Sequence, residues 1–333
     1  MTTPSTSVPL VTIVMYHFVR SASMASPRLH TLEPSAFREQ LRYLRRYYSP
    51  VRLGDVVDAA NGSTTLPARP VVLTFDDGYR DHYVNVFPLL VEHGMPATFF
   101  VARSALVDRH VLDTNKVQFI LAAVADPESL VVTIERAIAE CRDADVATVS
   151  EYRARWWVPS RVDDPRVAYI KRMLQHGLPD QVRRRLVSAL FERYVTSDEA
   201  AFAAGLYLTV DEAREMRGSG MDFGGHGDRH VPLTVLGQEA QAREIDGALQ
   251  ALDAIGVSRR PFAYSYVKGE HDATSLDLLR ARGCAVALTT REDVAQLGVD
   301  DLLTLPRIDT NCLPVDGDAD PNGWTAKVLE TSG

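Results

Sequence analysis

Cysteine is scarce in this sequence. Only three of the 333 residues are cysteines, Cys141, Cys284 and Cys312, and this odd number has no paired spacing. Such a pattern argues against a disulfide framework and favours free thiols that serve as small apolar side chains in a reducing compartment. Long apolar runs are missing as well, because no stretch approaches the roughly 18 apolar residues that a membrane-spanning helix needs. We therefore predict a protein without a transmembrane segment.

An excess of basic residues is also lacking. The chain has 36 lysines and arginines against 44 aspartates and glutamates, and its net charge of −8 gives no support for a nucleic-acid partner. The first basic residue is Arg20, and Thr12 interrupts the apolar run from Val8 to Tyr16. A signal peptide would begin with a charged region and continue with an unbroken apolar one. We therefore expect a cytoplasmic protein whose first apolar run is a strand.

What the sequence does contain is the alternation of an α/β protein. Short apolar runs at 10–17, 71–75 and 97–101 predict strands, and amphipathic segments that begin at Ser35 and span 79–93 predict helices between them. Strands that alternate with helices are typical of a parallel sheet or barrel. With 46% hydrophobic residues, the chain is long enough to bury a large core.

The middle of the chain departs from this alternation. From about 104 to 205 strand-like runs become rare and helical periodicity dominates, which predicts a helical insert. The α/β pattern resumes near Tyr207. We therefore predict one barrel-like domain over 8–313 that the insert interrupts, and an irregular acidic tail over 314–333. The insert is expected to form a lid, a side lobe or the surface of a homo-oligomer.

Two groups of polar residues carry the candidate chemistry. Asp76 and Asp77 directly follow the strand 71–75, and the carboxyl ends of buried strands are where α/β folds place reactive groups. Neighbouring strand residues point in opposite directions, so one acid can hold a metal ion while the other holds a proton. The alternative is a solvated Asp-Gly turn. His226 and His230 lie four residues apart, and on a helical turn this spacing brings two imidazoles around one ion.

Together the two groups resemble the motifs of a known family. Residues 74–79 read Thr-Phe-Asp-Asp-Gly-Tyr, and with the later His-x-x-x-His they are similar to the polysaccharide deacetylases of the NodB-homology, carbohydrate esterase 4 type. The resemblance implies an irregular (β/α) barrel of that type and the removal of N-acetyl or O-acetyl groups. It also implies that Asp76 is the general base and that Asp77, His226 and His230 hold a divalent metal ion, with zinc as the expected ion.

A third motif of the family is only partly present. The family's strand ends in Pro-Tyr-Gly, whereas residues 263–266 read Ala-Tyr-Ser-Tyr, with Ser265 where proline is usual and the glycine displaced to Gly269. The resemblance implies that the backbone N–H of Tyr266 stabilises the oxyanion of the reaction. A plain core strand with aromatic residues is the alternative.

The residue that would act as general acid is not the one usual in the family. The family's late Leu-x-x-His motif is missing, since no histidine follows His271. His17 is the best replacement, because it ends the first strand and resembles the Tyr-His of poly-N-acetylglucosamine deacetylases, in which that histidine is the acid. His271 and Asp272 are weaker candidates, and a purely structural histidine is the alternative for His17. Arg307 is predicted to orient Asp76 through a charge-assisted pair, unless it is a surface arginine.

These observations predict a metal-dependent deacetylase that hydrolyses the amide of an acetylated amino sugar. A cytoplasmic location and a helical insert favour a nucleotide-linked, lipid-linked or envelope-glycan precursor as substrate. The other candidates are a hydrolase of another amide or acyl group, such as an N-formyl sugar or a cyclic imide, and a sugar-binding protein without turnover. The incomplete motifs favour the binding protein, whereas a general base, Asp76, in addition to the ligands Asp77, His226 and His230 favours an enzyme.

Overall fold

The computed structural model describes residues 9–21, 29–141, 145–160 and 163–331. Contacts within the chain divide it into two compact units. We call one the barrel unit, which comprises residues 1–21, 31–109 and 204–333, and the other the helical unit, which comprises residues 22–30 and 110–203. The predicted domain limits at residues 8 and 333 lie outside the described part of the chain, and the division at 313 stays a prediction.

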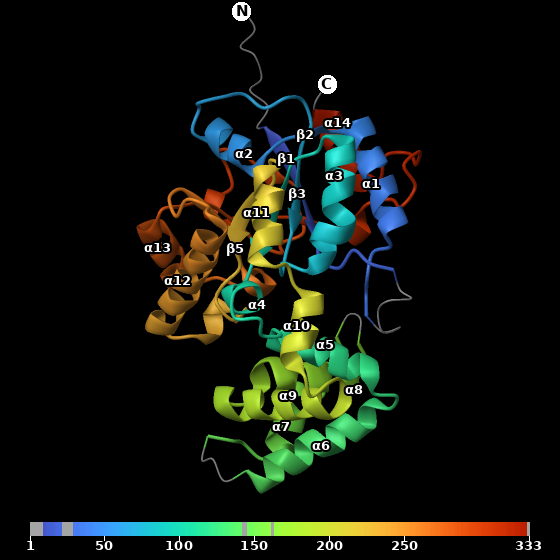
Figure 1. The fold of residues 1–333 in the computed structure, drawn as a ribbon, viewed down its shortest axis with the longest axis vertical. Coiled ribbons are helices and arrows are strands. Elements are labelled where there is room, and N and C mark those ends of the chain that lie inside the picture. The colour runs from blue at the N-terminus through green and yellow to red at the C-terminus, as the bar shows by residue number, and fades with distance from the viewer. Residues whose placement is uncertain (1–8, 22–28, 142–144, 161–162, 332–333) are drawn as a thin grey trace, which may run out of the picture. The chain divides into compact units, whose positions relative to one another are not determined.

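A curled sheet of nine strands forms the centre of the barrel unit (Figure 1). In chain order, the strands are β1 (Leu10–Tyr16), β2 (Ser49–Pro50), β3 (Pro70–Phe75), β4 (Ala97–Val101), β5 (Asp222–Gly225), β6 (Phe262–Ser265), β7 (Cys284–Leu288), β8 (Ala295–Gln296) and β9 (Ile308–Asp309). They are ordered β7-β6-β5-β4-β3-β1-β8, with β2 beside β3 and β9 beside β1. Every pair is parallel except β1 with β8. The predicted irregular (β/α) barrel is confirmed.

The segment before β9 connects the two sides of the curled sheet. Leu288 at the end of β7 forms a parallel bridge with Leu305, and β9 then pairs with β1. Arg307 lies between these two pairings and is only 1% exposed. The chain therefore carries a guanidinium group into the interior of the barrel unit, where it needs a charged partner.

Helices pack around the outside of this sheet (Figure 1). They are α1 (Pro34–Tyr47), α2 (Leu53–Ala60), α3 (Phe87–His93), α4 (Arg103–Leu106), α11 (Val210–Gly218), α12 (Gln238–Ile255), α13 (Ala273–Arg282) and α14 (Gly323–Thr331). The predicted helix 79–93 is divided into a π-helix, η2 (His82–Val86), and α3, which ends at Gly94 with a left-handed φ of 62°. The prediction of an irregular tail is wrong at α14, whose Val328 is buried against the core.

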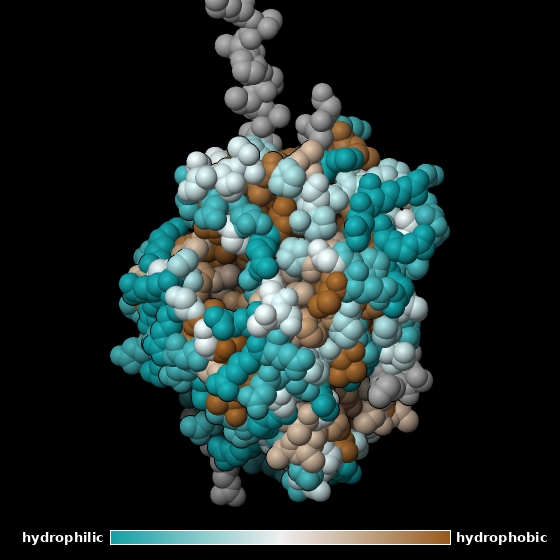
Figure 2. Space-filling view, turned by 45° about the horizontal axis from the view of Figure 1, so that its top comes forward, coloured by the Kyte–Doolittle hydropathy of each residue, from teal (hydrophilic) through white to brown (hydrophobic). Residues whose placement is uncertain are grey.

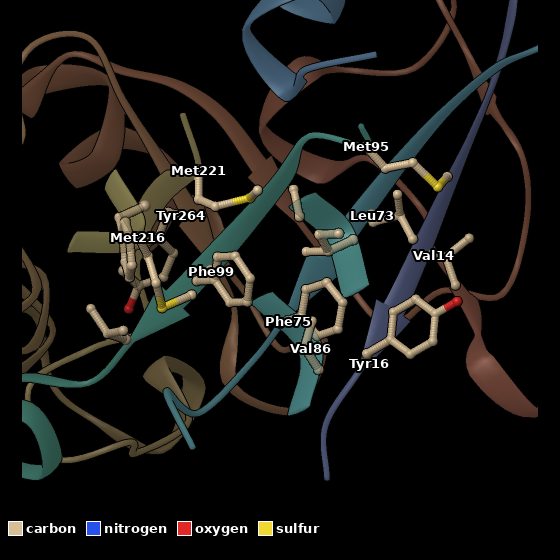
Figure 3. Close-up of a cluster of buried hydrophobic side chains, with 14 of the residues drawn as sticks. Val14, Tyr16, Leu73, Phe75, Val86, Met95, Phe99, Met216, Met221 and Tyr264 are labelled. Carbon is tan, nitrogen blue, oxygen red and sulfur yellow. The ribbon is translucent and has the colours of Figure 1, made fainter. Parts of the chain in front are cut away.

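A ladder of aromatic rings fixes the register of the central strands (Figure 3). Tyr16 of β1, Phe75 of β3, Phe99 of β4 and Phe223 of β5 occupy matching positions in neighbouring strands. Their ring centroids are 4.9, 4.9 and 5.6 Å apart in that order. Such pairs contribute about 0.5–1.5 kcal/mol each beyond the burial of their area. The ladder therefore opposes a shift in the register of β3 by one residue, which would move Asp76 and Asp77, the two acids that follow the strand, to the wrong faces of the sheet.

The helical unit is built from helices alone among its described residues. They are α5 (Asp113–Ala123), α6 (Pro127–Glu140), α7 (Val149–Trp156), α8 (Pro165–Arg172), the π-helix η3 (Met173–Gly177), α9 (Asp180–Tyr194) and the first part of α10 (Glu199–Leu206). Lys116 is 6% exposed, and its Nζ lies 2.8 Å from Glu199 Oε2, so this ion pair joins α5 to α10.

The chain leaves and re-enters the barrel unit at neighbouring points. The barrel unit ends at Arg109 and resumes at Ala204. Nη1 of Arg109 donates to the carbonyl of Leu208 at 2.7 Å, and the N–H of Leu208 donates to the carbonyl of Gly78 at 2.9 Å. The returning chain therefore contacts the turn that follows the two acids of β3.

The surface is mainly hydrophilic on the face drawn in Figure 2, where hydrophobic residues form separate patches. Large apolar side chains that stay exposed include Val84 and Val91, at 56% and 54%. Within the ranges that the structure describes, no helix combines the length and the hydropathy needed to cross a membrane.

Candidate active site

The two acids that follow β3, Asp76 and Asp77, make hydrogen bonds and ion pairs with different partners. β3 is buried along its whole length between β1 and β4. The N–H of Asp76 continues the strand pairing by donating to the carbonyl of Tyr16 at 3.0 Å. Asp77 has a φ of 72°, a left-handed value that turns the chain out of the strand, and Gly78 follows with a φ of 66°. This turn separates the directions of two side chains that are adjacent in sequence.

Asp76 is bound by Arg307. Both oxygens of the carboxylate accept from the guanidinium, at 3.0 Å from Nη1 and 2.8 Å from Nη2. Oγ of Ser265 also donates to Oδ2 of Asp76, at 3.1 Å. Burial raises the pKa of Asp76, but the charge of Arg307 and its hydrogen bonds outweigh burial and lower this pKa to about 2. Asp76 is therefore an ionised carboxylate at neutral pH, held in one orientation.

Asp77 faces the two histidines. Its Oδ1 lies 3.4 Å from Nε2 of His226 and 3.0 Å from Nε2 of His230, while its Oδ2 accepts from the hydroxyl of Tyr79 at 2.5 Å. The two imidazole rings meet edge to face with centroids 4.7 Å apart. One ligand atom from each of Asp77, His226 and His230 lies within 4.8 Å of the others. The structure thus brings together the three residues that the sequence pairs only by motif.

The expectation of a helical turn for the two histidines is wrong. His226 and His230 lie in a loop after β5, in which Gly227 and His230 have φ values of 85° and 60°. Two left-handed residues within four bend the chain back on itself, so the imidazoles meet without helical geometry. Glycine permits the first of these bends, but no sequence rule marks the second.

Helix α12 holds this loop in place. Oε2 of the buried Glu244 accepts from the N–H groups of Asp228 and Arg229, at 2.9 and 3.0 Å. A Cβ at Gly247 would lie only 2.4 Å from Cβ of Asp228, so the glycine gives the loop room to approach α12. Nε of Arg103 also donates to Asp228 at 2.7 Å. The backbone between the two histidines is therefore fixed by one helix and one ion pair.

The donor set of this cluster fits a divalent cation. Nδ1 of His226 lies 2.7 Å from the carbonyl of Ser265, which can only accept, so a neutral His226 carries its lone pair on Nε2, facing Asp77. Oδ1 of Asp77 is buried and makes no hydrogen bond of proper geometry within the described part of the chain. Acceptor atoms that converge in this way need a proton or a cation between them, and two nitrogens with one oxygen suit zinc.

The charges of the cluster act on each other's pKa. Burial raises the pKa of Asp77, but His230 and His226 outweigh it and hold that pKa well below its usual range. Burial lowers the pKa of both imidazoles. At His226 the neighbouring carboxylates overcome this effect and the pKa is raised, whereas at His230 burial dominates and the pKa is lowered.

His17 lies at the end of β1, next to the two acids. It follows the last residue of the strand and is exposed to solvent. Burial, the largest effect, raises the pKa of Asp76 and of Asp77, and closer charged groups lower both. The imidazole of His17 makes a smaller contribution that also lowers both pKa values. An exposed imidazole near both carboxylates can reach a bound substrate, which a buried structural histidine could not.

Tyr266 is placed differently from the prediction. Its backbone N–H donates to the carbonyl of Leu288 at 3.0 Å and so belongs to the pairing of β6 with β7. Its ring is buried beside His271, with centroids 5.0 Å apart. Asp272 caps α13 by accepting from the N–H of Ser275. The N–H of Tyr266 is therefore occupied within the sheet, and the two weaker acid candidates, His271 and Asp272, have structural contacts.

Sequence reasoning missed three residues that support the site, namely Ser265, His82 and Glu244. Ser265 contributes both its hydroxyl and its carbonyl, to Asp76 and His226, and its presence where proline is usual was the available signal. His82 donates to the carbonyl of His17, and Glu244 holds the histidine loop. The last two have no motif, because each acts on a backbone group far away in the sequence.

Known proteins resemble this chain in sequence and in fold. A sequence model described as polysaccharide deacetylase matches residues 63–161 and 186–287. The poly-beta-1,6-N-acetyl-D-glucosamine N-deacetylase of Escherichia coli K12 is 39% identical over 87 residues, which are 26% of this chain and only 13% of that protein.

Solved structures share the fold over nearly the whole chain. The Streptococcus pyogenes deacetylase PplD, in complex with acetate, has a TM-score of 0.58 and 18% identity, covering 98% of this chain and 99% of that one. IcaB from Ammonifex degensii has a TM-score of 0.54 and 17% identity, covering 97% of both chains. A de-N-acetylase from Aggregatibacter actinomycetemcomitans has a TM-score of 0.54 and 15% identity, covering 98% of this chain and 100% of that one. At these identities the likeness concerns the fold alone.

Proposed function

The chain belongs to the polysaccharide deacetylase family, and from this premise we propose that it is a metal-dependent hydrolase that removes an N-acetyl group from an amino sugar. One observation carries the proposal. Asp76 and Asp77 are adjacent, yet Asp76 is paired with Arg307 while Asp77 faces His226 and His230. A binding protein needs no oriented carboxylate beside a ligand set, whereas hydrolysis of an amide needs both.

Asp77, His226 and His230 are the residues that would hold the ion, and zinc is the ion we propose. When bound, a divalent ion supplies Lewis-acid polarisation of the amide carbonyl and lowers the pKa of water. Asp76 takes the proton of the attacking water, since it is ionised and Arg307 fixes its orientation. The fixed orientation matters because a base must lie within hydrogen-bond reach of the proton that it removes.

His17 is the proposed general acid. An amine is a poor leaving group unless its nitrogen is protonated as the C–N bond breaks. An exposed imidazole at the end of β1 can deliver that proton while Asp76 faces the water. This division of roles uses two side chains from neighbouring parallel strands, whose carboxyl ends lie at the same edge of the sheet.

The proposed substrates are nucleotide-linked, lipid-linked or envelope-glycan precursors that carry an N-acetylated sugar. The E. coli relative, whose name states a polymer of N-acetylglucosamine as substrate, supports the amino sugar, although the match spans 13% of its length. Another amide or acyl group, such as an N-formyl sugar or a cyclic imide, would use the same residues. A sugar-binding protein without turnover is the second candidate function. It is favoured by the backbone N–H of Tyr266, which donates to Leu288 within the sheet instead of facing a substrate. The cytoplasmic location and the homo-oligomer stay predictions.

Two substitutions test the assignment of the adjacent acids. Asp76→Asn should retain bound metal and lose activity about 10²- to 10⁴-fold, because only the basic oxygen is removed. Asp77→Asn should weaken metal binding first, so excess zinc should partly restore its activity. Metal content is measured by mass spectrometry, and turnover is measured with N-acetylglucosamine oligomers as substrate. The control is Asp211→Asn, because Asp211 is exposed. Rescue of Asp76→Asn by metal would reverse the two roles. Unchanged turnover in both variants would refute the proposal.

A further inference from the structure

His82 is a buried histidine whose side chain makes one hydrogen bond within the described residues, to the backbone of the proposed general acid. It is fully buried in η2, and its Nε2 lies 2.9 Å from the carbonyl oxygen of His17. A carbonyl only accepts, so Nε2 carries the proton and donates it. Nδ1 is buried and has no hydrogen-bond partner within the described ranges.

The surroundings of His82 do not explain a polar residue. Its ring packs against three aromatic rings, Phe75, Tyr79 and Phe99, at centroid distances of 5.4, 5.7 and 5.6 Å. Burial lowers its pKa to about 4, so the ring is neutral at neutral pH and keeps one tautomer. A phenylalanine would fill such a pocket without an unpaired nitrogen, which costs folding free energy. The one contact that only a donor can make is the bond to His17.

Residues 79–85, which include His82, contact each of the first four residues after β1. The ring of Phe18 stacks on Tyr79 with centroids 3.8 Å apart, and Nδ2 of Asn85 donates to the carbonyl of Val19 at 2.8 Å. Nε of Arg20 donates to Asp81 at 2.5 Å. This segment overlaps the π-helix η2, and such helices are often found at functional sites. Four successive residues after β1 are thus held by residues 79–85.

We propose that His82 is a positioning residue of the reaction, which holds the backbone of His17 so that its imidazole stays beside the two acids of β3. The inference rests on the proposed function, because it takes His17 to be the general acid. It extends that function by assigning a role to η2. Without the bond from His82, the backbone at the strand end gains freedom, and proton delivery to the leaving nitrogen becomes less frequent.

The experiment compares two substrates that differ in their need for an acid. An N-acetylglucosamine oligomer releases an amine and needs a proton, whereas 4-nitrophenyl acetate releases a stable phenolate and needs none. We expect His17→Gln to lower kcat on the amide about 10²- to 10⁴-fold and to change the ester rate little. His82→Phe should lower the amide kcat about tenfold, with KM, zinc content and the ester rate nearly unchanged, and His82→Gln, which keeps a donor, should recover part of the loss.

Each result has one meaning. Equal losses of His82→Phe on both substrates, or a loss matched by the core control Thr98→Val, would show a role in folding only and overturn the inference. Equal losses of His17→Gln on both substrates would remove the acid from His17, and the inference with it. A wild-type enzyme that cleaves neither substrate overturns the proposed function itself. If His82→Phe does not fold, Asn85→Leu must show the same selective loss on the amide.

Discussion

Replacing Arg307 with methionine tests the electrostatic core of the site. The substitution keeps an apolar stem and removes every donor of the guanidinium. Nε donates to the carbonyl of Thr289, Nη1 and Nη2 to the carboxylate of Asp76, and each of these two nitrogens also to one hydroxyl, of Thr74 and Ser265. Asp76 would remain buried without the cation that is hydrogen-bonded to it. Breaking a buried pair by removing one partner typically costs about 3–5 kcal/mol of unfolding free energy.

Part of this cost should depend on pH. In the native protein the pKa of Asp76 is lowered from 3.8 to about 2, which corresponds to about 2 kcal/mol of stability. Because the folded pKa lies below the unfolded one, this stability is fully present above pH 3.8 and is lost as the pH falls through about 2. In Arg307→Met the charge and the hydrogen bonds of Arg307 are lost, while burial and the charges of His226 and His17 remain. The folded pKa of Asp76 should therefore rise, and the stability that depends on its ionisation should shrink. The two proteins should therefore differ less at about pH 4 than at about pH 7.

Urea unfolding of the metal-free proteins measures both quantities. Arg291→Met is the control, because Arg291 is half exposed and its pairs should contribute about 1 kcal/mol or less. Adding Asp76→Asn to Arg307→Met should recover part of the lost stability, since the unpaired charge disappears. A loss below about 1 kcal/mol for Arg307→Met, with no dependence on pH, would refute the reasoning about the buried pair.

Two further predictions concern residues that support the site. Glu244→Ala should weaken zinc binding about 10- to 100-fold, measured by chelator competition, because the loop between the histidines loses its acceptor, while Glu239→Ala on the exposed face of α12 should not. His82→Phe should flatten the acid side of the stability curve. The folded pKa of His82 is lowered from 6.5 to about 4, so the wild type should lose about 3 kcal/mol as the pH falls through that window. Equal slopes for wild type and variant between about pH 7 and pH 4 would contradict the burial of an uncharged imidazole.

The sequence predicts those parts of this molecule that local physics determines. Apolar runs of the right length mark β1, β3 and β4, and Gly94 marks the end of α3. The two acids follow their strand directly, so their place at its carboxyl end follows from the run alone. The partner of Arg307 is far away in the sequence, but an arginine that directly follows an apolar run predicts a partner for a buried acid.

Other features depend on contacts that no short window contains. The histidine loop takes its shape from Glu244 and Gly247, so spacing alone wrongly indicates a helical turn. The N–H of Tyr266 is used by β7 because the third motif lies inside the sheet pairing. His82 has no motif in the sequence, yet it lies in a π-helix and is fully buried among aromatic rings. In each case, tertiary packing decides what local propensity leaves open.

The neighbouring exit and return of the chain at Arg109 and Leu208 have an evolutionary consequence. Because these two residues are joined by a hydrogen bond, the segment 110–203 of the helical unit leaves the barrel unit and returns to it at one hydrogen-bonded junction. An excursion with joined ends can be lengthened, shortened or exchanged at a small entropic cost, since closure of a longer loop adds only about 0.6 kcal/mol for each doubling. The strands and their acids would keep their pairing through such an exchange. Descendants of this chain could therefore acquire new helical modules by recombination at this junction while the hydrolytic residues stay in place.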